Sequence, residues 1–275
     1  MTLLALCSLK GSPGVTTTAL GLAEHWPTGH QPVVVECDPA GGDLLARFRL
    51  SLSPGLVSLA AAARRDTEPG LVWRHIQKLP GGLAVVAGPP AAEQARAALA
   101  QLTSSETTTF RRAADQKGAV VLADCGRIDA SAPAMRVLRQ ADVLLLLARA
   151  RDDAVARVAS MVDAVQEWSP EPRFVLVGDG YRSHDVAREL GIEVLARLPE
   201  DPFGAAALRG VGRRRATPAR SALGKALTVL ASQLADNGGG GSAEPSASTG
   251  PAARKGHLKL PAREGSAGHG NGAAR

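Results

Sequence analysis

The feature that most constrains the fold is a glycine-containing turn near the start of the chain. Residues 9–18, which we call the phosphate loop, read Leu-Lys-Gly-Ser-Pro-Gly-Val-Thr-Thr-Thr. The apolar residues 3–7 before it predict a short buried strand, and residues 19–24 after it are typical of the first turns of a helix. In this arrangement the backbone N–H groups of the turn and the helix N-terminus bind anions together. The stretch therefore predicts a phosphate-binding site.

Apolar segments and helix-forming segments alternate along most of the chain. The predicted strands after the first are residues 32–37, 82–87, 120–124, 143–148, 174–178 and 192–198. The predicted helices between and after them are residues 55–64, 91–102, 107–116, 152–168, 183–190, 203–209 and 218–235. This alternation predicts an α/β fold with a mostly parallel sheet and helices on both faces. Ligands of such sheets bind at the carboxyl ends of the strands, where the phosphate loop, Asp38 and Asp124 all lie.

Composition divides the chain into a folded part and a tail. With 275 residues, of which 45% are hydrophobic, the chain can bury the core of one large domain, which we place at residues 1–236. Residues 237–275 are mostly Gly, Ala, Ser and Pro, with almost no bulky apolar side chains. Such a segment cannot bury a core, so we expect it to be disordered.

Charge and cysteine content limit the partners and the compartment. The net charge of +6 permits contact with nucleic acid or anionic lipid, and 3% aromatic residues argue against base stacking. Three widely spaced cysteines favour a reducing compartment. No apolar run approaches the roughly 20 residues that span a bilayer, and the start of the chain lacks a signal-peptide pattern. We therefore expect a cytoplasmic protein, or one held peripherally at the inner face of the membrane.

The phosphate loop departs from the usual phosphate-binding motif, which ends Gly-Lys-Ser/Thr, because Val15 stands at the lysine position. It resembles the deviant Walker A loop of the MinD/ParA family, which reads Lys-Gly-Gly-x-Gly-Lys-Thr-Thr. The upstream signature lysine matches Lys10, and Ser12 replaces a glycine. The other matching positions are Gly11, Gly14 and Thr16. The resemblance covers most of residues 2–235 and implies a P-loop NTPase fold.

Two acidic motifs resemble those of the same family. Residues 36–39, Glu-Cys-Asp-Pro, are similar to its Asp-x-Asp-Pro motif, and Asp38 matches the acid that positions the attacking water. Asp124, at the end of a predicted strand, matches the Walker B acid that supports Mg²⁺. An acid at a strand end is often only a helix cap or a loop residue. Two acids at these positions behind a phosphate loop favour a site.

The resemblance implies ATP and Mg²⁺ as ligands, with binding of either weakened or lost. It assigns Lys10 and Asp38 to catalysis, with Lys10 reaching the partner's phosphates in a nucleotide-dependent homodimer. It assigns Thr16, Asp38 and Asp124 to Mg²⁺. The residues that it assigns to nucleotide binding are Lys10, Gly11, Ser12, Pro13, Gly14, Val15, Thr16 and Thr17.

Recognition of the base is also altered. Gly178 and Asp179 stand where the family has an asparagine that reads adenine, although residues 198–202, Leu-Pro-Glu-Asp-Pro, resemble its Ile-Pro-x-Asp segment. Arg127 is either a substitute for the missing loop cation or a surface arginine.

Two further groups of residues have a structural and a functional interpretation. The cysteines Cys7, Cys37 and Cys125 fall near strand ends, but no Cys-x-x-Cys pair exists, so we interpret them as apolar fillers rather than metal ligands. A basic cluster near the last predicted helix either contacts phosphates or is a solvated face. It consists of Arg209, Arg213, Arg214, Arg215, Arg220 and Lys225.

The sequences of these motifs are similar to those of a divergent actinobacterial branch of the family, near the CpaE/TadZ proteins. This implies a localisation or scaffold factor for Tad-type pilus or secretion assembly, with a CpaF-like secretion ATPase or a polar or membrane protein as partner. Because the loop lysine is replaced by Val15, we expect at most weak ATP hydrolysis. The alternatives are a ParA-type partitioning ATPase that contacts DNA and a MinD-type septum-positioning ATPase.

Overall fold

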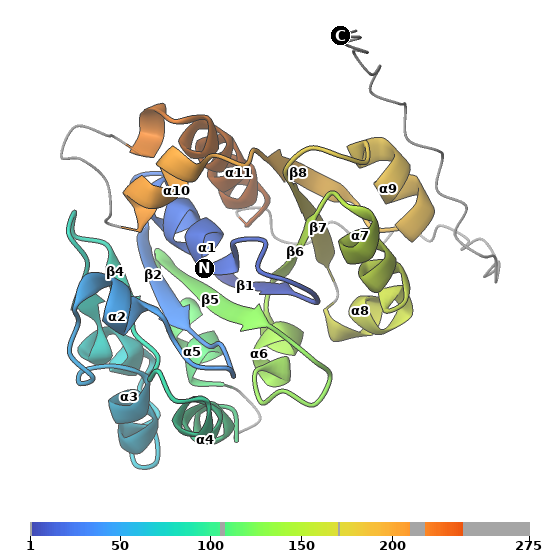
Figure 1. Ribbon diagram of the computed structural model, residues 1–275. Coiled ribbons are helices and arrows are strands. Elements are labelled where there is room, and N and C mark those ends of the chain that lie inside the picture. The colour runs from blue at the N-terminus through green and yellow to red at the C-terminus, as the bar shows by residue number, and fades with distance from the viewer. Residues whose placement is uncertain (1, 105–107, 170, 210–217, 239–275) are drawn as a thin grey trace, which may run out of the picture. The chain divides into compact units, whose positions relative to one another are not determined.

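Eight strands form one sheet in the order β3-β4-β2-β5-β1-β6-β7-β8 in the computed structural model, which describes residues 2–104, 108–169, 171–209 and 218–238 (Figure 1). All neighbouring strands pair in parallel except β3 and β4. The predicted α/β class with a mostly parallel sheet is therefore confirmed. The strands are β1 (Thr2–Ser8), β2 (Gln31–Glu36), β3 (Gln77–Lys78), β4 (Ala84–Val86), β5 (Ala119–Arg127), β6 (Val143–Arg149), β7 (Pro172–Val177) and β8 (Val194–Leu198).

Helices cover both faces of the sheet (Figure 1). One face packs against α1 (Val15–Glu24), α10 (Pro202–Leu208) and α11 (Ala222–Gly238), together with Leu44 of α2 (Leu44–Phe48). The helices of the other face are α3 (Leu56–Ala62), α4 (Ala92–Leu102), α5 (Thr109–Ala114), α6 (Met135–Gln140), α7 (Asp152–Ala159), α8 (Val162–Trp168) and α9 (Ser183–Leu190). Two 3₁₀ helices, η1 (Pro69–His75) and η2 (Pro218–Arg220), complete the described elements.

The central strands are apolar throughout because both of their faces are buried. In β1, Leu4 and Leu6 point toward the face of α1, whereas Leu3, Ala5 and Cys7 point toward the opposite face. A strand at this position must therefore be apolar throughout. Because β1 is a central strand, the loop that follows it lies in the middle of the sheet edge.

The structure differs from the predicted elements in several places. The predicted helix 152–168 is two helices, α7 and α8, separated at Ser160 and Met161. The Ser160 hydroxyl donates to the carbonyl oxygen of Arg157 at 2.8 Å, a local bond of the kind that competes with helix continuation. The elements α2, β3 and α6 were not predicted, since each has six residues or fewer and shows little periodicity.

Several predictions fall partly or wholly outside the described residues. These are the tail, of which only residues 237–238 are described, at the end of α11, and the arginines Arg213, Arg214 and Arg215. Within residues 2–104, 108–169, 171–209 and 218–238, no helix combines the length and apolarity needed to cross a membrane.

Candidate functional site

The phosphate loop connects β1 to α1 at the carboxyl edge of the sheet. Gly11 has φ of 69° and Gly14 has φ of 99°, in the left-handed region that favours glycine. Gly14 is the N-cap of α1, so the helix begins at Val15. The first N–H groups of a helix have no intrahelical partner, and here they adjoin the loop. The backbone therefore has the form of an anion-binding turn.

The strand register brings both predicted acids to this loop. Glu36 of β2 lies opposite Asp124 of β5, and Asp38 follows two residues later. Gly126 makes the close approach possible, because a Cβ on it would lie 1.8 Å from Oδ2 of Asp38. Its φ of 57° also favours glycine. The loop, Asp38 and Asp124 therefore converge, as the sequence predicted.

A cavity of about 360 Å³, which we call the loop cavity, is lined by the phosphate loop and Asp38, whereas the buried Asp124 is not among its lining residues. Its lining residues are Ser8, Gly11, Ser12, Gly14, Val15, Thr16, Thr17, Asp38, Ala40, Asp43, Arg47, Gly126 and Arg127. Six of the eight nucleotide-binding residues that the resemblance implied are among them. Lys10 and Pro13 are not.

Asp124 is the buried acid of the site. Burial raises the pKa of its carboxyl group to about 6, against the opposing effects of the Thr16 hydroxyl and the Gly126 N–H. Its Oδ1 accepts that N–H at 3.2 Å, while Oδ2 has no hydrogen-bond partner among the described residues. A buried carboxylate with an open oxygen beside a hydroxyl is costly to leave unpaired. The pair is suited to Mg²⁺, which prefers oxygen ligands.

The protein offers few metal ligands at this position. Among the residues that the structure describes, no group of three or more His, Cys, Asp or Glu side chains could hold a metal ion. Mg²⁺ is usually bound through one or two carboxylates together with phosphate oxygens and water. The donor set at Asp124 and Thr16 therefore fits a metal that arrives with a phosphate ligand.

Asp38 lies at the border of the same cavity. Burial raises the pKa of its carboxyl group, and the nearby Arg127 opposes this rise. Its Oδ1 accepts the N–H of Ala40 at 2.7 Å. A carboxylate with one oxygen held in this way can present the other to a ligand or water in the cavity.

Glu36 serves the loop that carries Asp38 rather than the cavity itself. Its Oε1 accepts the N–H groups of Asp43 at 2.7 Å and Leu44 at 3.0 Å, and its Oε2 accepts the N–H of Gly88 at 2.9 Å. Burial raises the pKa of this carboxyl group to about 7. Glu36 therefore caps the start of α2 and ties it to the end of β4, a role that the sequence did not reveal.

The cations of the site are not at the usual loop position. Val15 is 6% exposed and contributes an apolar wall to the loop cavity. Arg127 had two interpretations, a substitute for the missing loop cation or a surface arginine. It lines the cavity, but it is exposed. Arg47, at the end of α2, also lines it. No sequence pattern indicated Arg47, which is simply a basic residue shortly after the Asp38 segment.

Lys10 points away from the loop cavity. Its Nζ forms an ion pair with Oδ2 of Asp153, at the start of α7, at 3.2 Å. The hydrogen bond from Lys10 lowers the pKa of Asp153. Both side chains are more than half exposed. Lys10 has a partner within its own chain, and its role across a dimer stays a prediction.

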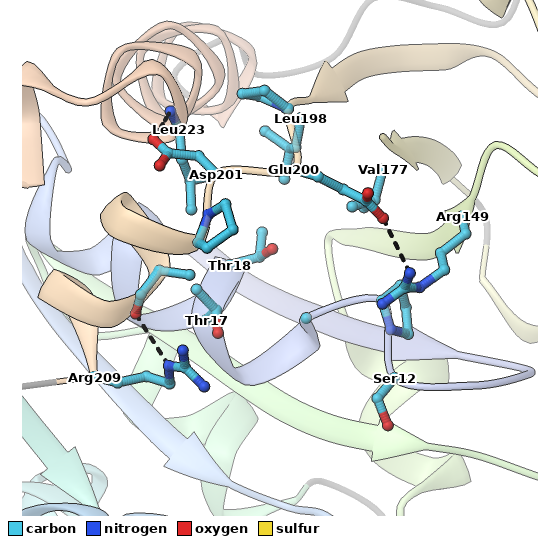
Figure 2. A pocket seen from close by; sticks show the side chains of 15 residues that line it. Ser12, Thr17, Thr18, Arg149, Val177, Leu198, Glu200, Asp201, Arg209 and Leu223 are labelled. Carbon is cyan, nitrogen blue, oxygen red and sulfur yellow. Dashed lines mark hydrogen bonds and ion pairs between the residues drawn. The ribbon is translucent and has the colours of Figure 1, made fainter. Parts of the chain in front are cut away.

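A second cavity of about 410 Å³ lies on the other side of the phosphate loop and shares Ser12, Gly14 and Thr17 with the first (Figure 2). Residues 198–202 form part of its wall. Figure 2 shows Arg149 paired with Glu200, at 3.0 Å, above Ser12. A Cβ on Gly178 would lie 3.1 Å from the Glu200 side chain, so Glu200 occupies the space next to this glycine.

Asp201, which the sequence matched to a family motif, holds the wall of this second cavity together. Its carboxylate accepts the N–H of Gly204 at 2.8 Å and that of Leu223 at 3.1 Å. It thereby caps α10 and joins it to the start of α11. Arg209 of the predicted basic cluster also lines this cavity (Figure 2).

The three cysteines are fully buried and free, and their side chains belong to one hydrophobic core. Burial raises the pKa of Cys7, and contact with Cys37 together with burial raises that of Cys125. Both thiols are therefore protonated, which agrees with the prediction that they are apolar fillers.

Comparison with known proteins gives a fold and no close relative. No protein-family model matches the chain, and no curated protein matches it. Among solved structures, a ParA family ATPase from Chlorobium tepidum has a TM-score of 0.67 at 16% identity, covering 85% of this chain and 99% of that one. The septum site-determining protein MinD from Pyrococcus horikoshii, complexed with Mg-ADP, has a TM-score of 0.67 at 17% identity, covering 87% and 98%.

A third structure shows how broadly this fold is used. Cobyrinic acid a,c-diamide synthase from Mycobacterium smegmatis, with a bound ATP analogue and magnesium, has a TM-score of 0.59 at 18% identity, covering 90% of this chain and 99% of that one. The chain therefore has the fold of the MinD/ParA P-loop ATPases. At these identities the comparison shows the fold alone.

Proposed function

We propose that the protein binds a nucleoside triphosphate, ATP, in the loop cavity together with Mg²⁺. The observation that carries the proposal is the buried, unpartnered Oδ2 of Asp124 beside Thr16, at the N-terminus of α1. The P. horikoshii and M. smegmatis proteins of the same fold were solved with a nucleotide or an analogue and magnesium, which supports this ligand class.

In this proposal the backbone of residues 11–17 binds the phosphates, and Thr16, Asp124 and Asp38 would hold the hydrated Mg²⁺. Bound Mg²⁺ would neutralise charge on the phosphate oxygens. Asp38 orients a water molecule toward the outer phosphate. Hydrolysis is weak, because Val15 offers no charge-assisted hydrogen bond, a contact that contributes about 1.5–3 kcal/mol in ordinary sites and more where charge develops.

We infer that the biological role is that of a localisation or scaffold factor, of the kind found in Tad-type pilus or secretion assembly. A loop that keeps Gly11 and Gly14, beside two acids suited to Mg²⁺, but lacks the lysine supports binding over rapid turnover. The partners of such a factor are a second copy of the chain and a CpaF-like secretion ATPase or a polar or membrane protein. Partitioning and septum positioning need repeated hydrolysis, so brisk phosphate release would favour those roles instead.

A titration with a fluorescent ATP analogue, with Mg²⁺ or with EDTA, tests the binding step. We expect binding that strengthens with Mg²⁺ and that loses this dependence in Asp124→Ala. Asp163→Ala, which removes an exposed carboxylate of α8, is the matched control and should leave binding unchanged. Absence of binding by the unaltered protein at millimolar nucleotide would refute the proposed function.

A further inference from the structure

Arg47 lines the loop cavity and has an unused hydrogen-bond donor. Its Nη2 pairs with Asp43, one helical turn earlier. Its Nη1 is buried and has no hydrogen-bond partner among the described residues. A buried charged donor without a partner is destabilising, because it has lost its hydration and gained no acceptor. A buried donor without a partner, on a residue that lines a cavity, indicates that a ligand in the cavity supplies the acceptor.

The surroundings of Arg47 favour an anion as that acceptor. The phosphate loop and the N-terminus of α1 line the same cavity. The charge of Arg47 lowers the pKa of Asp124, so the guanidinium acts on the buried acid of the site. A phosphate bound to the loop would therefore meet Arg47 on the same side as Asp124 and Asp38.

Other cations near the loop are less well placed. Lys10 is paired with Asp153 and does not line the cavity. Arg127 lines it but is exposed, so solvent and salt screen its charge. Arg47 is the more sheltered, with 29% of its side chain exposed.

The fold holds Arg47 in position before any ligand binds. Glu36 accepts the N–H groups of Asp43 and Leu44, which fixes the first turn of α2. Leu44 is fully buried and belongs to the same hydrophobic core as Val15. Asp43 then orients the guanidinium through the ion pair. A binding group that is held in this way loses little freedom when the ligand arrives.

We propose that Arg47 binds the terminal phosphate of the nucleotide and supplies the positive charge that Val15 removed from the loop. This inference rests on the proposed function, because it assigns a residue to the same site. Guanidinium groups bind phosphate through parallel hydrogen bonds, and one free Nη suffices for the first of them. Compared with the usual phosphate-binding loop, the cation comes from α2 rather than from the loop, but it faces the same cavity.

Calorimetric titration of Arg47→Gln with ATP·Mg and ADP·Mg tests the assignment. Loss of a charge-assisted bond predicts that the Kd for ATP rises by about tenfold or more, while the Kd for ADP changes by less than about threefold. Arg49→Gln is the matched control, since Arg49 is exposed two residues later and does not line the cavity. It should leave both affinities unchanged.

The outcomes separate this inference from the proposed function. If the unaltered protein binds neither nucleotide, the proposed function fails. If it binds ATP and Arg47→Gln binds it equally well, Arg47 is not the phosphate ligand, and nucleotide binding stands. Adding Val15→Lys to Arg47→Gln should restore the preference for ATP over ADP, because the new ammonium enters the same cavity.

A second variant covers the case in which Arg47→Gln does not fold. Arg47→Lys keeps the charge but lacks the guanidinium fork, so it cannot hold Asp43 and a phosphate in the same geometry. We expect the preference for ATP over ADP to fall in this variant. An unchanged preference would overturn the assignment.

Discussion

At the scale of single residues, Asp124 destabilises the ligand-free protein although it is well suited to the proposed binding site. Its carboxyl group is fully buried with one oxygen unpartnered, and burial raises its pKa from the ordinary 3.8 to about 6. The folded chain therefore binds a proton that the unfolded chain has released at intermediate pH. The contribution of this group to the free energy of unfolding falls as pH rises from about 4 to about 6, and above that range the loss is complete.

Replacing Asp124 by Asn should therefore stabilise the nucleotide-free protein at pH 8. We expect the free energy of unfolding to rise by about 3 kcal/mol at pH 8, since the pKa is raised by about two units and one unit corresponds to about 1.4 kcal/mol. Near pH 4.5 we expect a much smaller gain. Urea unfolding at both values measures this, and the partly buried histidines cancel in the difference between variant and parent. A gain of equal size at both pH values, or a loss at pH 8, would contradict the buried-charge account.

The link between β2 and α2 determines the site at the scale of elements. A single side chain, Glu36, accepts three backbone N–H groups from the start of α2 and the end of β4. It stands directly before the segment that carries Asp38, and α2 carries Arg47. The position of both groups in the loop cavity therefore depends on one buried carboxylate.

Glu36→Ala should cost about 2–4 kcal/mol of the free energy of unfolding, because the three N–H donors lose their acceptor. The same change should weaken ATP binding, since the start of α2 is released. Chemical denaturation and nucleotide titration are the two measurements. Glu93→Ala in the first turn of α4, an exposed carboxylate, is the control. A variant as stable as the parent would show that the three bonds are replaced by water.

The elements also show what the sequence could predict. The strands of the sheet core were predicted because segments such as residues 143–148 are apolar on both faces and short. The phosphate loop, Asp38 and Asp124 were predicted because they follow such strands. Arg47 and the role of Glu36 were not, because α2 has five residues and no detectable period. The role of Glu36 depends partly on its contact with Gly88, which is distant in sequence, and no local pattern encodes this contact.

At the scale of the whole molecule, we predict that Lys10 connects the site to assembly. In the described chain it pairs with Asp153 of α7, and this exposed ion pair is easily exchanged for another partner. A second copy with nucleotide bound offers such a partner in its phosphates. Two empty loops, each with the positive end of a helix, would repel one another.

Sedimentation should therefore show a dimer that forms with ATP·Mg and weakens with salt. Lys10→Ala should remain monomeric under the same conditions. Arg127→Ala is the control, because it removes an exposed cation that the predicted contact of Lys10 with the second copy does not require. If the parent and Lys10→Ala dimerise equally, or if both stay monomeric, Lys10 does not act across a dimer.

Truncation tests the predicted boundary between the domain and the tail. Residues 237–275 lack the apolar content to fold, so removal of residues 243–275 should leave the thermal midpoint nearly unchanged. Thermal unfolding of the full chain and of the truncated chain gives the comparison. A midpoint lower by many degrees would show that the tail stabilises the domain.

The central claim is that this chain holds ATP in the loop cavity and scarcely hydrolyses it. The most direct measurement is to incubate the protein with labelled ATP and Mg²⁺, separate the protein with its bound nucleotide, and identify that nucleotide. We expect about one nucleotide per chain, recovered as intact ATP. Recovery of no nucleotide, or of ADP in place of ATP, would contradict it.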